Sequence, residues 1–354
     1  MKIFLYLLFF MCFGLFLYNG CTKKEGNYNE LIKFEHITDT LRAQAVEDIT
    51  VYTNRNVYLT VADTFLVVAQ GREPFIHVYS TNTHAQLAAF GRKGKGPGEF
   101  IDATLLNQVS RDSDTNAPLL KIHDFKQSKV TTVNVHDAVN GETIFPQRRL
   151  PNVGSYLVHL HHINDNFFIA TPHSGGNLLI YDFNTATFTT VPYLPKLTFD
   201  VPKHSLYHIY RPAVYFNKNA NTIAAAPYCL GELDFFDMEG NLTQASIFEP
   251  RDRYQDELEN GNFSKDSNLK YYIVELEVAE GLIYGLNHNR AIKDYENEIV
   301  DNKLQVFNWK GQAVKEYPLD DFYIFSFAID EVHNRIYGYA PDEEEHNIVI
   351  YNLK

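Results

Sequence analysis

Five apolar segments along the chain end in the same way, with an aromatic residue followed by a small polar residue. They are Val78-Tyr79-Ser80, Ile180-Tyr181-Asp182, Phe235-Phe236-Asp237, Val306-Phe307-Asn308 and Ile350-Tyr351-Asn352. Two of them continue into the same turn, which has glycine three residues after the Asp or Asn. A repeat of strand-sized segments restricts the fold to architectures that repeat a small sheet, and this one is typical of propeller blades.

A second series of short apolar segments completes the repeat. Its members are bounded by Asn, Asp or Gly, which is the pattern of β-strands. They cover residues 64–69, 119–124, 166–170, 222–226, 281–285 and 334–339, and 129–135 is the partner strand of the second member. The units number six, at about 55 residues each, close to the period of known propeller repeats. The sequence therefore predicts an all-β, six-bladed β-propeller, with a pair of β-sandwiches as the alternative.

The last unit stops after its third strand, at residues 348–352. A fourth strand must then come from elsewhere, and we expect the strand-like segment 31–37 to supply it. A ring closed by an N-terminal strand removes exposed sheet edges and ties the two ends of the domain together.

The N-terminal segment is typical of an export signal. Lys2 precedes an almost unbroken apolar run, and Gly20 stands directly before Cys21. A charged start, an apolar core and a small residue before the cut form the pattern of a signal peptide. A small residue before Cys is also similar to a bacterial lipobox, in which the Cys thiol is acylated. Tyr18 and Asn19 depart from the usual lipobox residues, so an uncleaved signal anchor is the alternative.

These features predict three parts of the chain: a signal peptide at 1–20, a lipidated tether at 21–30 and a propeller domain at 31–354. Acyl chains on Cys21 would hold the domain at a membrane surface without a spanning helix. The expected location is the cell envelope, at the inner or outer membrane.

Charge and cysteine content exclude several classes of function. The chain has 31 Lys and Arg against 44 Asp and Glu, interspersed, so it lacks the basic face of a nucleic-acid-binding protein. Cys229 is the one cysteine of residues 31–354, which excludes an intrachain disulfide and a cysteine-based metal site there. No nucleophile-elbow or zincin motif occurs. We therefore predict no catalytic residue, no cofactor and no metal.

Residues 90–100, Phe-Gly-Arg-Lys-Gly-Lys-Gly-Pro-Gly-Glu-Phe, contain four glycines and a proline. A phosphate-binding loop would need a helix after the glycines, but Pro97 follows Gly96. We expect a structural turn instead. Glycines 94, 96 and 98 would allow positive φ, Glu99 would accept backbone N–H bonds within the loop, and Phe100 would return to the core.

This stretch resembles the Gly-x-Gly-Pro-Gly-Glu-Phe turn of NHL-type propeller repeats, which leads from the outer strand of one blade to the inner strand of the next. Residues 122–130, Ile-His-Asp-Phe-Lys-Gln-Ser-Lys-Val, are similar to the Val-x-Asp-x-x-Asn-x-Arg-Ile stretch of the same repeats. Together with the lipobox, these motifs resemble those of six-bladed propeller lipoproteins of Bacteroidetes, TolB-like or NHL-like.

Several basic residues are candidates for ligand binding, because outer-to-inner loops of a propeller gather around the mouth of the central channel. Arg92, Lys93 and Lys95 flank the glycine turn, and His208 and Arg211 precede a strand-like segment. A basic and aromatic channel mouth suits an anionic ligand or the acidic loop of a partner protein.

Two histidines are further candidates. His159 and His161 share one face of the strand predicted around them, and on an inner strand they would face the channel, where a metal could bind. Histidines on a single strand are more often hydrogen-bonded structural residues, so we predict no metal there.

The sequence thus predicts a membrane-anchored, non-enzymatic binding or scaffold module for a protein or a small ligand. The alternative is a metal-dependent propeller hydrolase of the lactonase kind. Such an enzyme centres a metal on acidic and amide residues of the inner strands. The inner strands that can be placed from the sequence offer mainly His, Tyr and Arg, which disfavours this alternative.

Overall fold

A computed structural model describes residues 31–52, 57–151, 157–164, 166–172, 178–191, 197–261, 263–295, 301–320 and 322–353. The predicted signal peptide at 1–20, the tether at 21–30 and the lipidation site Cys21 lie outside the described residues. Within the described ranges, no helix is both long enough and apolar enough to cross a membrane.

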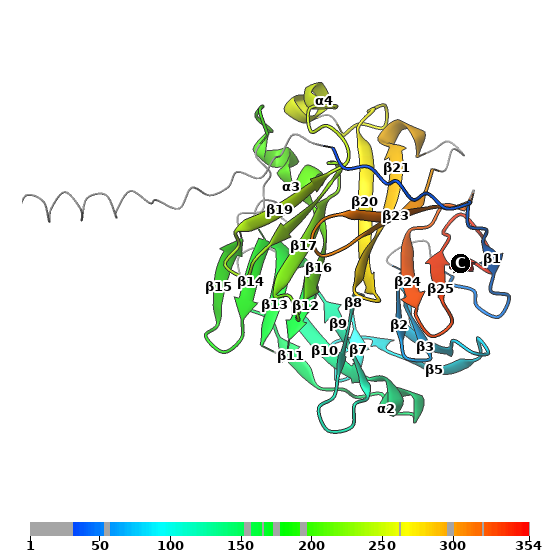
Figure 1. The fold of residues 1–354 in the computed structure, drawn as a ribbon. Coiled ribbons are helices and arrows are strands. Elements are labelled where there is room, and N and C mark those ends of the chain that lie inside the picture. The colour runs from blue at the N-terminus through cyan, green and yellow to red at the C-terminus, as the bar shows by residue number, and fades with distance from the viewer. Residues whose placement is uncertain are drawn as a thin grey trace, which may run out of the picture. The chain divides into compact units, whose positions relative to one another are not determined.

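Six four-stranded antiparallel sheets follow one another along the chain, as the repeat predicts (Figure 1). We number them as blades 1 to 6. Blade 1 consists of β2 (Tyr58–Ala62), β3 (Phe65–Ala69), β4 (Ile76–Ser80) and β5 (Gln86–Phe90). Blade 2 consists of β8 (Ala103–Arg111), β9 (Pro118–Asp124), β10 (Lys129–Asn134) and β11 (Gln147–Arg149). Blade 3 consists of β12 (Leu157–Asn164), β13 (Phe167–Pro172), β14 (Leu178–Asp182) and β15 (Thr187–Val191).

The second half of the ring repeats this order. Blade 4 consists of β16 (Pro212–Asn217), β17 (Thr222–Pro227), β18 (Glu232–Phe236) and β19 (Leu242–Ile247). Blade 5 consists of β20 (Lys270–Ala279), β21 (Leu282–Ala291), β22 (Lys303–Phe307) and β23 (Ala313–Pro318). Blade 6 consists of β24 (Ser326–Asp330), β25 (Arg335–Tyr339), β26 (Ile348–Asn352) and β1 (Gln44–Ala45).

The two series of sequence segments are the second and third strands of the blades. The aromatic residues that end the third strands are all buried: Tyr79, Tyr181, Phe236, Phe307 and Tyr351. All of them except Tyr181 belong to apolar clusters between neighbouring blades. In four of the five segments, the polar residue that follows caps the turn, because its side chain accepts a backbone N–H. Asp237 Oδ1 accepts from Asn241 N at 2.7 Å, and Asn308 Oδ1 accepts from Lys310 N at 2.9 Å. Each repeat unit therefore encodes both a packing contact and a turn.

The first strand of each blade is the inner strand. The inner strands β2, β8, β12, β16, β20 and β24 contact one another in this order, and β24 returns to β2. Among the described residues, buried apolar side chains form six clusters, one at each interface between neighbouring blades.

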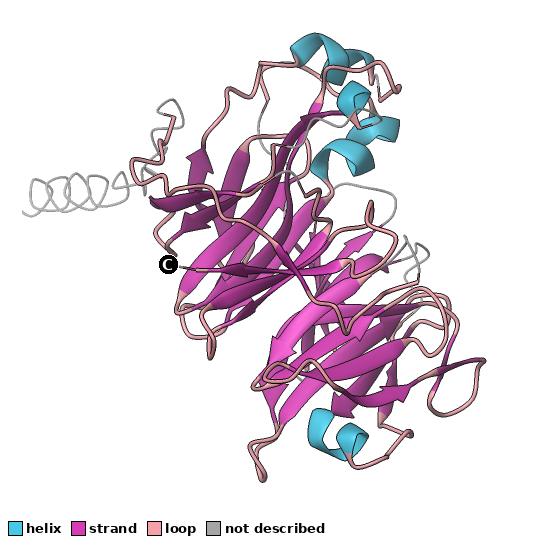
Figure 2. Ribbon diagram, turned by 90° about the vertical axis from the view of Figure 1, so that its right-hand side faces the viewer, coloured by secondary structure: helices cyan, strands magenta, loops and turns pink. Residues whose placement is uncertain are grey.

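We define the upper end of the ring as the one at which the inner strands begin. The short helix α3 (Leu206–Tyr210) lies there, directly before the inner strand of blade 4. Helix α4 (Gln255–Asn260) lies on the same side of the strands as α3, and α2 (Val135–Val139) lies on the opposite side (Figures 1 and 2).

The strand that closes blade 6 is β1, not the segment 31–37 that we expected from the sequence. Gln44 and Ala45 pair with Ile350 and Val349 of β26. The ring is thus closed by an N-terminal strand, as predicted, but this strand comes later in the chain.

Segment 31–37 instead runs along the outer edges of blades 4 and 5. Ile32 N donates to the carbonyl of Ile247 in β19 at 2.8 Å, and Ile37 forms a parallel bridge with Glu316 in β23. Ile32 and Phe34 pack on the apolar cluster between these two blades. Ile32 and Phe34, which gave the segment its strand-like pattern, therefore pack against blades 4 and 5 and not against blade 6.

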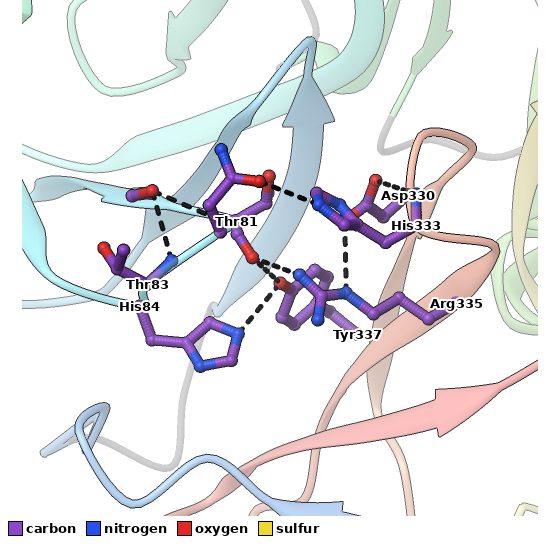
Figure 3. A network of polar contacts seen from close by, with 9 residues as sticks. Thr81, Thr83, His84, Asp330, His333, Arg335 and Tyr337 are labelled. Atoms are coloured by element: carbon purple, nitrogen blue, oxygen red, sulfur yellow. Dashed lines mark hydrogen bonds and ion pairs between the residues drawn. The ribbon is translucent and has the colours of Figure 1, made fainter.

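A polar network joins blade 6 to blade 1 below the closing strand (Figure 3). The buried Asp330 Oδ2 accepts from Arg335 Nε at 3.1 Å and contacts His333 Nδ1 at 2.7 Å. Arg335 also donates to the carbonyl of Thr81, which follows β4, and His333 Nε2 contacts Asn82 Oδ1 at 2.8 Å. The two ends of the propeller are thus held together both by backbone pairing and by this network.

The glycine stretch is the corner between blades 1 and 2, as predicted. β6 (Arg92–Lys93) pairs in parallel with β7 (Glu99–Phe100), and Phe100 is buried. Glu99 Oε2 accepts from Gly96 N at 2.7 Å. Positive φ occurs at Gly91 and Gly98, with values of +85° and +71°. Of the three glycines expected to allow a positive φ, Gly98 adopts it and Gly94 and Gly96 do not. Gly94 is needed for space, since a Cβ there would lie 2.0 Å from the Glu99 carboxylate.

The second motif, residues 122–130, anchors this corner. Lys129 Nζ donates to the carbonyl of Glu99 at 2.6 Å, and Gln127 Nε2 donates to the carbonyl of Gly94 at 3.1 Å. Asp124 Oδ2 accepts from Ile101 N at 2.7 Å. The two motifs occur together because side chains of the second form hydrogen bonds with backbone groups of the first.

Replacement of Asp330 by Asn should destabilise the propeller strongly. It leaves the partly buried Arg335 without its carboxylate, so we expect the free energy of unfolding to fall by about 3 kcal/mol. The control is Asp63→Asn, which breaks the exposed pair with Arg111 and should cost less than about 1 kcal/mol. Urea unfolding of both variants measures these losses. Equal losses in the two variants would show that the network does not hold the ring.

Candidate functional site

Blade 2 reaches across the axis of the ring in the lower half of the inner strands. The pairing of β8 with β9 is irregular between Leu106 and Ser110. Within this irregular stretch, Asn107 Nδ2 donates to the carbonyl of Leu276 in blade 5 at 3.2 Å. Gln108 Nε2 donates to the carbonyl of Phe216 in blade 4 at 2.8 Å. We call these two contacts the amide bridge.

Above the amide bridge, aromatic and charged side chains from blades 1, 4 and 5 come together. Tyr58 is the first residue of the inner strand β2, and Arg211 directly precedes the inner strand β16. Tyr228 follows β17, and Tyr271 and Glu275 lie on the inner strand β20. We call these five residues the channel mouth.

Electrostatic effects at Tyr58 show how close these groups lie. Burial raises the pKa of Tyr58 to about 12. The charge of Arg211 and a hydrogen bond with Thr104 act against this rise, whereas Glu275 and Asp102 add to it. Tyr58 is therefore within electrostatic range of groups from blades 2, 4 and 5.

The Arg211 guanidinium and two tyrosine rings of the channel mouth contact one another directly. Arg211 Nη2 donates to the hydroxyl of Tyr228 at 3.3 Å, and the guanidinium carbon lies 4.6 Å from the centroid of the Tyr228 ring. The Tyr228 and Tyr271 rings meet edge to face, with centroids 5.5 Å apart. Such contacts fix the rings in place and leave them able to contact a ligand.

An aromatic rim extends the channel mouth toward blades 5 and 6. The Tyr271 ring lies 5.4 Å from that of Tyr295, which lies 6.0 Å from that of Tyr323. The His288 ring lies 4.9 Å from that of Tyr323, and the Arg290 guanidinium lies 4.9 Å from the Tyr295 ring centroid.

Glu275 is held by the first two residues of β24 in blade 6. Its Oε2 accepts from Phe327 N at 2.8 Å, and its Oε1 accepts from Ser326 Oγ at 3.3 Å. Burial raises the pKa of Glu275 to about 8, and the two hydrogen bonds only partly offset this rise. The carboxyl group is therefore mostly protonated at neutral pH.

A second acidic side chain lies farther along the same strand. Burial raises the pKa of Glu277 well above its ordinary range, and the charge of Glu275 adds to the effect. Glu277 Oε1 is buried and, among the described residues, has no hydrogen-bond partner. Two acids with raised pKa values on one inner strand mark a functional-site candidate.

The structure distributes the residues selected from the sequence over different places. Arg211 lies in the channel mouth. His208 lies on α3, exposed to solvent, and its ring contacts that of Phe263 at 5.3 Å. His161 lies on the inner strand β12, where burial lowers its pKa to about 4. The side chain of His159 lies outside the described residues.

The basic residues of the glycine corner are not brought to the channel mouth. Arg92, Lys93 and Lys95 are exposed. Lys93 N donates to Glu73 Oε2 at 2.8 Å, and Gly98 packs against the carbonyl of Thr143, which precedes the outer strand β11. These contacts hold the three basic residues near the outer strands of blades 1 and 2. The part of the connection that approaches the axis is Asp102, which acts on Tyr58.

The expectation that the inner strands offer mainly His, Tyr and Arg was incomplete. The structure adds two acids, Glu275 and Glu277, and two amides, Asn107 and Gln108. The signal for the acids was present, because Glu occupies alternate positions in the apolar segment 270–279. Within the described ranges, however, no three His, Cys, Asp or Glu side chains are grouped so that they could hold a metal ion.

The sequence matches the model of the family described as TolB-like 6-blade propeller-like over residues 35–332. The chain therefore belongs to the TolB-like six-bladed propeller family, which confirms the fold predicted from the repeat and the glycine corner.

Two solved structures from Bacteroides share this fold. A member of the DUF4221 family from Bacteroides vulgatus is 10% identical, with a TM-score of 0.59 over 92% of this chain and 99% of its own. A protein from Bacteroides fragilis that carries the description "exported protein" is 14% identical, with a TM-score of 0.56 over 92% of this chain and 100% of its own. Comparison with curated proteins finds no match. At these identities the likeness shows the fold alone.

Replacement of Glu275 by Gln should flatten the pH dependence of stability. The folded-state pKa of about 8 lies above the ordinary value of 4.5. The folded chain then keeps a proton that the unfolded chain releases, so this stabilisation is complete below pH 4.5 and is lost as the pH rises toward 8. The loss amounts to about 1.4 kcal/mol per pH unit for one group.

Urea unfolding at pH 5, 6, 7 and 8 measures this effect. We expect a shallower decline in Glu275→Gln than in the wild type, and the other buried acids with raised pKa values, Glu277, Glu232 and Asp234, contribute to the remaining slope. The control Glu344→Gln changes an exposed acid and should keep the wild-type slope. An unchanged slope in Glu275→Gln would mean that Glu275 is ionised in the folded protein.

Proposed function

We propose that this protein is a non-enzymatic binding module, held at the cell envelope by a lipid anchor on Cys21, with its ligand site at the channel mouth. One observation carries the proposal. Aromatic, cationic and carboxyl groups from three blades converge directly above the amide bridge. Sites for small ligands combine apolar and aromatic walls with a few convergent polar groups, and the channel mouth has this composition.

The protonation states of the residues favour binding over catalysis. The Tyr58 phenol has a pKa raised to about 12 by burial, so it is a weak nucleophile at neutral pH. Burial also raises the pKa of the Cys229 thiol and lowers that of His161 to about 4. Both oxygens of Glu275 accept hydrogen bonds from blade 6. The pKa shifts of Tyr58, Cys229 and His161 move these groups away from neutral pH, which disfavours proton transfer by them, and Glu275 is held in fixed hydrogen bonds.

The proposed location rests on the residues around Cys21 and on the description of the Bacteroides fragilis protein as exported. Acyl chains on Cys21 would place a stable domain at the membrane surface, with the short segment 21–30 as its tether.

Replacement of Cys21 by Ala should release the protein from the membrane. In a bacterial host that processes lipoproteins, the wild type should sediment with the membranes and Cys21→Ala should not, because acylation needs the thiol. The control Cys12→Ala changes a cysteine of the predicted signal peptide and should remain membrane-bound. If Cys21→Ala also stays in the membrane fraction, the segment 1–20 is an uncleaved anchor and the lipoprotein assignment fails.

A panel of small molecules should reveal the binding site. We expect at least one compound, among organic acids, amino acids and sugars, to raise the Tm of the soluble domain in differential scanning fluorimetry. Tyr271→Ala should lose this shift, because the ring forms a wall of the channel mouth. Tyr52→Ala, which changes a tyrosine that is 69% exposed, should keep it. The proposal fails if no compound raises the Tm, or if the shift is the same in Tyr271→Ala.

A further inference from the structure

Arg211 differs from Arg251 and Arg335, two other partly buried arginines, in forming no ion pair with a carboxylate among the described residues. Arg251 Nε lies 2.5 Å from Glu232, and Arg335 Nε lies 3.1 Å from Asp330; both carboxylates are fully buried. The contacts of Arg211 are to phenols, Tyr228 at 3.3 Å and Tyr207. Among the described residues, no carboxylate forms an ion pair with Arg211.

A partly buried charge without a counter-ion is costly, because desolvation is not offset by an ion pair. The nearby acid does not remove this cost. Glu275 is engaged by Phe327 N and Ser326 Oγ, and it is mostly protonated at neutral pH. Among the described residues, the Arg211 guanidinium therefore lies among phenol rings without a carboxylate partner.

We propose that the channel mouth binds a small organic carboxylate, whose carboxylate group pairs with Arg211 and whose carbon skeleton lies against Tyr58, Tyr228 and Tyr271. This inference rests on the proposed binding function and names its ligand class. The planar guanidinium presents parallel N–H groups that match the two oxygens of a carboxylate. The phenol rings supply apolar surface for the skeleton, and their hydroxyls supply hydrogen bonds.

The charge of the site favours a monoanion over a phosphate dianion. Arg211 is the one cation among the five residues of the channel mouth, and Arg290 of the aromatic rim lies against the Tyr295 ring. A dianion would keep one negative charge unpaired in a partly desolvated place, which is unfavourable. We therefore expect phosphate to bind less tightly than a monocarboxylate.

The experiment compares acids with their uncharged amides on the complete mature domain. The probes are benzoate and benzamide, 4-hydroxyphenylacetate and its amide, glucuronate and glucuronamide, and inorganic phosphate. Isothermal titration calorimetry and Tm shifts report binding. We expect at least one acid to bind at least tenfold more tightly than its amide and than phosphate.

Variants of Arg211 then test the assigned residue. Arg211→Gln should weaken binding of that acid at least tenfold, and Arg211→Lys, which keeps the charge without the planar fork, should weaken it less. Tyr228→Phe removes the hydroxyl that orients Arg211 and provides a second variant if Arg211→Gln does not fold. We expect it to weaken binding of the acid several-fold and to leave the amide unchanged. The control Arg42→Gln changes an exposed arginine and should bind as the wild type does.

The outcomes separate this inference from the function on which it rests. If an amide or a neutral sugar binds as tightly as the acids and Arg211→Gln does not matter, the carboxylate inference is overturned while the binding function stands. Tighter binding of phosphate overturns the choice of a monoanion. If no acid binds to the wild type, the inference is overturned, and the binding function fails as well only if neutral compounds do not bind either.

Discussion

Every blade of this protein has two faces that must be covered by a neighbour, and only a closed ring covers all of them. The described residues form an apolar cluster at each of the six interfaces, including the one between blade 6 and blade 1. That last interface joins segments from opposite ends of the chain, so the chain itself does not enforce it. The pairing of β1 with β26 and the network around Asp330 supply the missing link. The remainder of the structure depends on this closure.

The candidate site is a consequence of the closed ring. Tyr58 lies in blade 1, Arg211 and Tyr228 belong to blade 4, and Glu275 lies in blade 5 and is bonded to blade 6. No single blade contains the site, so an opened ring would separate its members. The irregular stretch of β8 adds the second element, because Asn107 and Gln108 leave their own sheet and bond to the opposite blades. Irregular strand pairing often occurs next to functional sites, where it redirects side chains.

The sequence predicted those parts of the fold that are encoded locally. Aromatic residues such as Phe307 end the third strands, and polar residues such as Asn308 cap the turns that follow, so both can be recognised within a few residues. The glycine corner could also be recognised, because Glu99 and Phe100 act within the same short loop. We expected Gly94 to serve a positive φ, but its role is to leave space for the Glu99 carboxylate. A sequence does not show such a contact.

The parts that could not be predicted depend on contacts between distant segments. Segment 31–37 and the pair Gln44–Ala45 both precede blade 1, and only the fit of Ile32 and Phe34 against blades 4 and 5 decides which of them closes the ring. Arg211 could be selected from the sequence as a basic residue near a strand. The absence of an ion pair at Arg211 among the described residues could not be predicted, because an ion pair joins two distant places in the fold. The acids on β20 were missed for a similar reason, since alternating Glu residues are also typical of a solvated strand.

A crystal structure of residues 31–354 at a resolution that shows water molecules is the decisive test of the amide bridge and the channel mouth. We expect Asn107 and Gln108 to span the axis of the ring, with ordered water or ligand density above them, against Arg211, Tyr228 and Glu275. A continuous column of water through the ring, with the two amides turned away from blades 4 and 5, would contradict it. So would a carboxylate of this same chain paired with Arg211.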